Sequence, residues 1–240
     1  QFLGIGASNF IDMEYCKQRN IKVGTVSDYG SNAVAEFSLC CAMALAKKII
    51  QADQVVKNQN WSIENLLGKE IVNSVFGVVG TGKIGSLVTR KVHALGGKTI
   101  AFDTYKNESL INDCGTQYCN LEEIFSKSDF ISIHLALNKD TKNYINGNFL
   151  RLMKNTSFLV NTSRAEVIDY KILYDLLANK KIAGAALDVF PEEPLNDFSL
   201  CQLENVISTP HIAYYTDSSN RNLLKKSVES IIRFLEKGDS

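Results

Sequence analysis

The sequence predicts an α/β fold in which a parallel sheet is covered by helices on both sides. Short apolar runs rich in β-branched residues alternate with helix-like stretches over the last two thirds of the chain. Continuous apolar runs are typical of parallel strands, because both faces of such strands are buried. The 240 residues are 45% hydrophobic, which suits one large core or two modest ones. We therefore expect a doubly wound sheet accompanied by a smaller second domain.

The first 30 residues predict two short strand and helix pieces that cannot form a core alone. Apolar runs at 2–6 and 21–23 suit strands, and residues 12–20 suit a helix between them. From residue 31 the pattern changes to a long helix that reaches about Val56, with Ser31 or Asn32 as its N-cap.

This long helix is apolar on nearly every side, which is typical of a helix buried between domains or subunits. We expect Cys40, Cys41 and Met43 on it to be core residues rather than part of a cofactor site. Residues 58–70, around the only tryptophan, Trp61, are polar and irregular, and they predict an exposed arm.

From residue 75 onward the chain predicts about six strands that alternate with helices. The expected strands lie at 75–79, 98–102, 130–134, 157–161, 182–189 and 206–208. The expected helices lie at 83–95, 121–127 with Asn120 as its cap, 149–154, 170–179 and 218–237. The last helix is amphipathic, with an apolar side formed by Leu223, Leu224, Val228, Ile231 and Leu235.

A glycine motif follows the first of these strands. Gly80, Gly82 and Gly85 form the pattern G-x-G-x-x-G between a strand and a helix. In this setting the first glycine permits a tight turn, the second lets the backbone approach a pyrophosphate, and the third lets the helix lie close to the strand. The N–H groups at the start of the helix then face the anion. The strands and the motif together predict a dinucleotide-binding domain of the Rossmann type.

An acidic residue indicates which nucleotide binds. Asp103 ends the strand at 98–102, close to the expected ~20 residues beyond the glycines. A carboxylate at this place can accept both ribose hydroxyl groups and would repel a 2′-phosphate. We therefore expect NAD rather than NADP.

Polar residues also follow the last three predicted strands of the sheet. In chain order they supply a cation at Arg164, a carboxylate among Asp188, Glu192 and Glu193, and an imidazole at His211. Ligands bind beyond the carboxyl ends of the strands in such sheets, so we expect the three side chains at one edge. A guanidinium can clamp a carboxylate, an imidazole can exchange a proton with a hydroxyl group, and a carboxylate can stabilise the imidazolium. The set therefore fits carbonyl reduction by hydride transfer.

The chain resembles the D-isomer-specific 2-hydroxyacid dehydrogenases over essentially its whole length. The resemblance rests on motifs in the family's order at 77–85, 134–137, 161–169, 185–194 and 209–211. It implies that Arg164 binds the substrate carboxylate and carbonyl, that His211 is the acid/base, and that Glu193 is the partner of the histidine. Glu193 matches the family position rather than Glu192, because it directly precedes Pro194.

The same resemblance implies which residues contact NAD. They are Gly80, Gly82, Lys83, Ile84, Gly85, Asp103, His134, Thr162, Ser163 and Asp188. Asp188 would hold the nicotinamide amide. His134 would line the cofactor cleft, and it ranks below His211 as a candidate base. No metal site is expected.

The chain departs from the family pattern in two positions and at its start. Ala165 stands where the family usually has glycine, and Ala136 where it usually has proline, without loss of a group that does chemistry. Family members carry roughly one more half-domain upstream, and Gln1 in place of Met suggests an internal start. The resemblance thus implies three parts: a remnant of a flavodoxin-like substrate domain at 1–30, the NAD-binding domain at 31–212, and a return to the substrate domain at 213–240.

The residues after His211 bear on the substrate. Tyr214 and Tyr215 resemble the D-lactate dehydrogenase branch, which has an aromatic residue after the histidine, more than the phosphoglycerate dehydrogenases, which have small residues there. A bulky aromatic side chain favours a small 2-oxo acid with an uncharged side chain, such as pyruvate. Three alternatives stay open: an NAD-binding module similar to transcriptional corepressors, an inactive truncated form, and a phosphoglycerate dehydrogenase-type substrate.

Composition limits the other partners. Lys plus Arg and Asp plus Glu number 26 each, so no net charge favours nucleic acid or an anionic membrane. No apolar run approaches ~18 residues, and no signal peptide opens the chain. The six cysteines lack the spacing of a metal site and suit reduced thiols in a cytoplasmic protein. The resemblance implies a homodimer, in which the helix from Ser31 and the Trp61 arm are covered by the second cofactor domain.

Overall fold

The computed structural model describes residues 1–4, 7 and 11–237. The chain divides into two compact units by its internal contacts. Val34–Ala213 form the larger unit, and Gln1–Ala33 together with Tyr214–Ser240 form the smaller one. The roles expected of these parts stay predictions.

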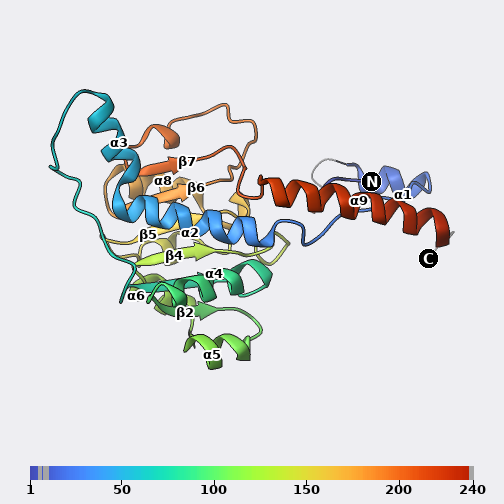
Figure 1. The fold of residues 1–240 in the computed structure, drawn as a ribbon, viewed down its shortest axis with the longest axis horizontal. Coiled ribbons are helices and arrows are strands. Elements are labelled where there is room, and N and C mark those ends of the chain that lie inside the picture. The colour runs from blue at the N-terminus through green and yellow to red at the C-terminus, as the bar shows by residue number, and fades with distance from the viewer. Residues whose placement is uncertain (5–6, 8–10, 238–240) are drawn as a thin grey trace. The chain divides into compact units, whose positions relative to one another are not determined.

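The larger unit is built on one parallel sheet, which has seven strands within the described residues (Figure 1). The strands are β1 (Val75–Val79), β2 (Lys98–Phe102), β3 (Gln117–Tyr118), β4 (Phe130–Ile133), β5 (Phe158–Asn161), β6 (Gly184–Leu187) and β7 (Val206–Ser208). Their order across the sheet is β3-β2-β1-β4-β5-β6-β7. The strand order therefore reverses between β1 and β4. Open α/β sheets bind their ligands at such a reversal, beyond the carboxyl ends of the strands.

Helices cover both faces of this sheet, which confirms the predicted doubly wound α/β class. The helices are α2 (Ser31–Lys47), α3 (Ile49–Lys57), α4 (Lys83–Ala94), α5 (Glu108–Cys114), α6 (Leu121–Lys127), α7 (Gly147–Leu150) and α8 (Tyr170–Ala178). Side chains of α6, α7 and α8 join the core on one face, and those of α2 and α4 join the core on the other. Within the sheet, the rings of Phe76, Phe130 and Phe158 stack on adjacent strands, with centroids 4.7 and 5.4 Å apart. No helix among the described residues is both long and apolar enough to cross a membrane.

Most elements of the larger unit lie where the sequence predicts them, but two were missed. The strand β3 has only two residues, which is too short to show a periodic pattern. The helix α5 has seven residues and begins after Asn107, whose side chain accepts a hydrogen bond from the Ser109 N–H at 3.1 Å. The strand β3 forms the edge of the sheet beside β2, and α5 directly precedes β3 in the chain.

Capping residues set several helix starts. Asn120 caps α6 as predicted, since its side chain accepts from the Glu123 N–H at 2.8 Å. Asn146 caps α7, which therefore begins at Gly147 and ends at Leu150, so it overlaps only the start of the predicted range of 149–154. Ser31 is the first residue of α2 rather than its cap.

The single helix predicted over 31–56 is wrong, because the chain forms α2 and α3 instead. Lys48 separates them with a φ of 51°, a left-handed conformation that ends a helix. Within this chain α2 packs one face on the sheet, and its burial between domains or subunits stays a prediction. Cys41 lies in that core, whereas Cys40 and Met43 are exposed.

Residues 58–70 form the irregular, exposed arm that the sequence predicts. Trp61, Ile63 and Leu67 are 91%, 89% and 90% exposed. The Lys48 ammonium donates a hydrogen bond to the Asn65 carbonyl oxygen at 2.6 Å. The arm is therefore tied to the break between α2 and α3, while its large apolar side chains face solvent in this chain.

The smaller unit contains the helices α1 (Met13–Gln18) and α9 (Asp217–Lys237). Residues 2–4 and 21–23 do not form the predicted strands, although the Phe2 N–H donates to the Gly24 carbonyl oxygen at 2.8 Å. The rest of the first predicted strand, at 5–6, and most of the loop around Gly4 to Asn9 lie outside the described residues. Of the apolar side predicted on α9, Leu223 is buried and the other four side chains are exposed.

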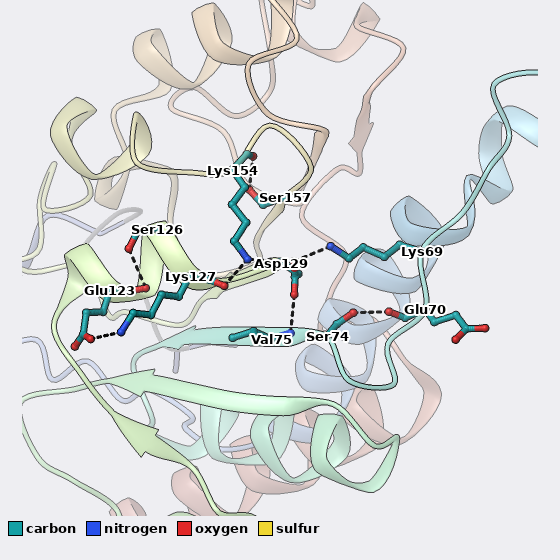
Figure 2. A network of polar contacts seen from close by, with 10 residues as sticks. All are labelled: Lys69, Glu70, Ser74, Val75, Glu123, Ser126, Lys127, Asp129, Lys154 and Ser157. Atoms are coloured by element: carbon teal, nitrogen blue, oxygen red, sulfur yellow. Dashed lines mark hydrogen bonds and ion pairs between the residues drawn. The ribbon is translucent and has the colours of Figure 1, made fainter.

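Charged side chains close the amino end of the sheet around Asp129, which directly precedes β4 (Figure 2). One carboxylate oxygen accepts from the Val75 N–H at 2.8 Å, and the other accepts from Lys69 and Lys154 at 2.7 and 3.3 Å. The Asp129 N–H donates to the Val75 carbonyl at 2.7 Å, and its carbonyl accepts from the Phe158 N–H at 3.0 Å. Burial opposes ionisation, but the hydrogen bonds from Lys69 and Val75 and the two lysine charges lower the pKa of Asp129. One residue thus joins β1, β4 and β5.

Candidate active site

The glycine motif forms the turn between β1 and α4. Gly80 has a φ of 91°, which residues with a side chain rarely adopt. A Cβ on Gly85 would lie 1.9 Å from the Gly80 carbonyl oxygen, so the helix can approach the turn only with glycine there. A Cβ on Gly82 would meet nothing within 4 Å, which means that the turn opens outward at this residue. Lys83 and Ile84 begin α4 beside this opening, and their position at the helix start fits a pyrophosphate.

Asp103 follows β2 and binds the same turn. Its Oδ2 accepts from the N–H and the hydroxyl of Thr81, at 2.6 and 3.2 Å. Its Oδ1 accepts from the Thr104 hydroxyl and the Tyr105 N–H, both at 3.2 Å. Burial opposes the charge, but these hydrogen bonds lower the pKa of Asp103. The residue expected to bind the ribose is therefore an ionised, half-buried carboxylate beside the glycine turn at 80–85, which we call the phosphate turn.

His134 follows β4 and borders the turn from the other side. Its N–H donates to the Val79 carbonyl at 2.8 Å, and its own carbonyl oxygen would lie 2.8 Å from a Cβ on Gly80. The ring Nε2 shares a hydrogen bond of 2.8 Å with the Ser132 hydroxyl. Burial lowers the pKa of His134 to about 4, so the imidazole is neutral at neutral pH. A neutral ring in this place suits a wall of the cofactor cleft better than a proton donor.

The turn after β5 carries three predicted residues, Thr162, Ser163 and Arg164. The Asn161 side chain shapes this turn, since its Oδ1 accepts from the N–H and the hydroxyl of Ser163, at 3.0 and 2.8 Å. The Thr162 hydroxyl bonds the Ser38 hydroxyl of α2 at 2.8 Å, and both groups are buried. The Arg164 guanidinium donates to the Ser163 carbonyl at 2.7 Å. This partner is neutral, so the contact leaves the positive charge of Arg164 uncompensated.

Glu193 and His211 meet at the carboxyl ends of β6 and β7. The His211 Nδ1 lies 2.8 Å from the Glu193 Oε2, and the Glu193 Oε1 accepts from the Phe190 N–H at 2.9 Å. The carboxylate is thus held from one side by the backbone and contacts the imidazole from the other. The structure brings these two predicted residues together, while their catalytic roles stay predictions.

Asp188, directly after β6, holds the turn that carries His211. The residue is 1% exposed. Its Oδ1 accepts from the Thr209 hydroxyl and the Ile212 N–H at 2.6 and 2.9 Å, and its Oδ2 accepts from the Ala213 N–H at 2.8 Å. His211 has a φ of 55°, a strained backbone for a residue with a side chain. Bonds on both sides of His211 stabilise that conformation, a role that the sequence did not reveal. The expected contact of Asp188 with the nicotinamide amide stays a prediction.

Tyr170, the first residue of α8, is a further part of the site that the sequence did not reveal. Its hydroxyl donates to the Val189 carbonyl at 2.6 Å, and its ring packs edge-on against Phe190, with centroids 6.4 Å apart. Burial raises the pKa of Tyr170, so the hydroxyl is a protonated donor at neutral pH. Tyr170 therefore holds the peptide whose N–H, on Phe190, binds Glu193. No local pattern could indicate this role, because it depends on how α8 packs beside the loop after β6.

The six cysteines are free thiols. Burial raises the pKa of Cys41 to about 12, and it also raises the pKa of Cys114 and of Cys119. These three thiols are protonated at neutral pH and are therefore poor nucleophiles.

Residues 39–213 match the family model for the NAD binding domain of D-isomer specific 2-hydroxyacid dehydrogenases. The chain belongs to the D-isomer-specific 2-hydroxyacid dehydrogenase family. It is 34% identical over 235 residues to a glyoxylate reductase of Korarchaeum cryptofilum, which covers 96% of this chain and 70% of that protein. It is 36% identical over 228 residues to a D-3-phosphoglycerate dehydrogenase of Synechocystis, which covers 95% of this chain and 41% of that protein. A D-lactate dehydrogenase from Aquifex aeolicus, solved with NAD and lactic acid, superposes with a TM-score of 0.88 at 34% identity, over 99% of this chain and 75% of that one.

These similarities confirm the predicted family, the oxidoreductase class and NAD as the cofactor of this dehydrogenase. The matched domain is an NAD-binding one, and the Aquifex structure contains NAD. The names of the three relatives point to different substrates, so membership in the family leaves the substrate open. The chain spans 70% of the glyoxylate reductase but only 41% of the phosphoglycerate dehydrogenase.

Proposed function

We propose that this dehydrogenase interconverts a D-2-hydroxy acid and the matching 2-oxo acid. The observation that carries the proposal is the contact of 2.8 Å between His211 and Glu193, at the sheet edge that also holds the phosphate turn and Arg164. Bound NADH supplies a hydride to the carbonyl carbon of the oxo acid. The residues at this edge supply what the rest of the reaction needs, a proton and a place for the carboxylate.

Each of the three residues has one task in the direction of reduction. Arg164 binds the carboxylate of the oxo acid and polarises its carbonyl group. Glu193 accepts the hydrogen bond from Nδ1 of His211 and stabilises the imidazolium. Nε2 of His211 then donates its proton to the carbonyl oxygen. The carbon gains two electrons with the hydride and the oxygen gains the proton, so the product is the 2-hydroxy acid; oxidation reverses each transfer.

The test of this mechanism is the variant His211→Ala, assayed for 2-oxo acid reduction and for NADH binding. We expect turnover to fall by about 10²–10⁴-fold, because general acid catalysis contributes that much, while NADH binding persists. His93→Ala is the matched control, since His93 is an exposed histidine of α4. Unchanged reduction by His211→Ala would overturn the assignment. NADH binding without turnover in the unaltered chain would instead favour the corepressor-like module or an inactive form.

We propose a small 2-oxo acid with an uncharged side chain, such as pyruvate, as the substrate. Two features support it: the aromatic Tyr214 and Tyr215 soon after His211, and the similarity to a D-lactate dehydrogenase. The 36% identity to a D-3-phosphoglycerate dehydrogenase supports the alternative of a phosphorylated substrate. A panel of pyruvate, glyoxylate, hydroxypyruvate and 3-phosphohydroxypyruvate separates them by kcat/KM. The proposal fails if the phosphorylated acid is better than pyruvate by about tenfold, or ~1.4 kcal/mol in transition-state binding.

We propose that the chain acts as a cytoplasmic homodimer. The exposed Trp61, Ile63 and Leu67 support this assembly, because clustered apolar side chains on a surface mark interaction sites. Within each copy, the larger unit would bind NAD, and the smaller unit would belong to the substrate domain. Sedimentation of the purified chain should give a dimer mass, and Trp61→Ser should weaken the dimer. A monomer at every protein concentration would contradict the proposal.

A further inference from the structure

Thr81 is buried inside the phosphate turn, between Gly80 and Gly82. Its N–H and its hydroxyl both donate to Oδ2 of Asp103, at 2.6 and 3.2 Å. The same hydroxyl accepts a hydrogen bond from the Tyr118 hydroxyl at 2.8 Å. Thr81 therefore links the carboxylate at the expected ribose site to a tyrosine on the edge strand β3.

Asn107 closes these contacts into a ring of hydrogen bonds. Its backbone N–H donates to the Tyr118 hydroxyl at 3.0 Å, and its side-chain amide donates to the Ser86 hydroxyl at 3.2 Å. The Ser86 hydroxyl donates to the Thr81 carbonyl at 2.6 Å. The cap of α5, the edge strand β3 and the first turn of α4 thus all hold one residue of the phosphate turn.

The ring determines where each hydroxyl proton points. The Tyr118 oxygen accepts from the Asn107 N–H, and its single proton is directed at the Thr81 oxygen. The proton of Thr81 is then directed at Asp103, which as a carboxylate can only accept. If Tyr118 lost its hydroxyl, the Thr81 hydroxyl could turn elsewhere, and one of the bonds that orient Asp103 would be lost.

We infer that Tyr118 is a positioning residue that sets the selectivity for NAD over NADP, by holding Thr81 and through it Asp103. An oriented Asp103 accepts the ribose hydroxyls and keeps its negative charge where a 2′-phosphate would lie. A misoriented Asp103 binds the ribose less well and repels the phosphate less strongly. The inference rests on the NAD site that the family shares, and it is independent of the substrate proposed above.

Direct binding of NADH and NADPH, followed by nicotinamide fluorescence without any oxo acid, tests the inference. Tyr118→Phe should raise the Kd for NADH by about threefold to tenfold, as expected for one lost hydrogen bond in a network. It should lower the preference for NADH over NADPH by a similar factor, and Asp103→Ala should remove most of that preference. Tyr174→Phe removes a hydroxyl from α8 and is the matched control, for which both Kd values should stay unchanged.

A second variant and a double variant make the result decisive. Thr81→Val removes the hydroxyl but keeps the N–H bond to Asp103, so it should reproduce the loss of preference even if Tyr118→Phe folds poorly. In the Asp103→Ala background, Tyr118→Phe should change the preference by less than about twofold, because the residue through which it acts is gone. Wild-type preference in Thr81→Val or in a folded Tyr118→Phe overturns the inference, and so does an equal effect of Tyr118→Phe in both backgrounds. Failure of the proposed reaction would affect none of these measurements, since no substrate is present.

Discussion

The two ends of the parallel sheet use charged residues in opposite ways. At the amino end, Asp129 is surrounded by Lys69, Lys154 and the Val75 N–H, so its charge is fully engaged within the chain (Figure 2). At the carboxyl end, the Arg164 guanidinium donates to a neutral group, the Ser163 carbonyl. The amino end therefore uses charge to join strands, whereas the carboxyl end, although Asp188 is engaged there, also holds the charge of Arg164 ready for a ligand.

The backbone at the carboxyl end also contains a strained residue of the candidate site. Asp129 joins β1, β4 and β5 through ordinary strand geometry. His211 at the carboxyl end has a φ of 55°, which must be stabilised by neighbours such as Asp188, whereas the φ of 91° at Gly80 is accessible to glycine without strain. Strain of this kind persists only where the surrounding structure enforces it. We therefore expect substitutions at the amino end to change stability and substitutions at the carboxyl end to change function.

Among the substitutions that test this contrast, Arg164→Met at the carboxyl end should have the largest effect. Loss of the charged, bidentate partner of the substrate carboxylate should lower kcat/KM by about 10²–10³-fold, or ~3–4 kcal/mol. The unfolding free energy should change little, because within the described part of the chain the hydrogen bond that the guanidinium loses is the one to the neighbouring Ser163 carbonyl. Steady-state kinetics and urea unfolding measure the two quantities. Arg164→Lys, which keeps the charge but not the fork of donors, should recover only part of the activity. Wild-type kcat/KM in Arg164→Met would remove the carboxylate clamp from the mechanism.

Asp129→Ala should show the opposite pattern. It removes three hydrogen bonds to a mostly buried carboxylate and leaves the Val75 N–H without that acceptor, so the unfolding free energy should fall by about 2–3 kcal/mol. NADH binding and kcat should stay near the wild-type values at a temperature where the variant is folded. The control is Glu123→Ala, which removes an exposed ion pair with Lys127 in the same network. It should change the unfolding free energy very little. A large loss of NADH affinity in folded Asp129→Ala would mean that the two ends are not independent.

The same contrast explains what the sequence could and could not predict. The strand β1, the Asn120 cap and the glycine turn depend on local patterns, and each lies where it was predicted. Glu193 and His211 were paired only through long motifs in a fixed order, since they lie 18 residues apart. At both ends of the sheet, the reliable signals were those that a short stretch of sequence carries by itself.

The residues that were missed act across the fold. Tyr118, Tyr170 and Asp129 each bind groups from elements distant in sequence, and nothing around them marks the partner. Lys48 broke the long predicted helix because it adopts a left-handed conformation that usually requires glycine or asparagine. Tertiary contacts, rather than local propensity, decide where a lysine adopts that conformation. The sequence therefore did not reveal the helix break at Lys48.

Tyr170→Phe should affect both stability and catalysis moderately. It therefore tests how strictly these two properties are divided between the two ends of the sheet. Loss of the buried bond to the Val189 carbonyl should lower the unfolding free energy by about 1–1.5 kcal/mol. The loop that orients Glu193 should become less ordered, which should lower kcat several-fold without changing the Kd for NADH. A pH profile of kcat should move as well, because Glu193 supports the imidazolium of His211. If stability falls and neither kcat nor the pH profile changes, Tyr170 is a structural residue only.

The smallest effect should be a dependence of stability on pH at the amino end. Asp129→Asn keeps an acceptor for the Val75 N–H but loses the charge, so at pH 7 it should be less stable by about 1 kcal/mol, given that both lysines are partly exposed. The pKa of Asp129 is lowered in the folded protein, so the ionised residue stabilises the fold above its unfolded pKa of ~3.9 and loses this contribution as the pH falls through the lower folded value. The difference in unfolding free energy between wild type and Asp129→Asn should therefore be constant from pH 7 to 5 and shrink below pH ~4. Urea unfolding of both proteins across this range measures it, and other carboxyl groups cancel in the difference. If the difference in unfolding free energy stays constant down to pH ~3, the charge of Asp129 does not stabilise the amino end.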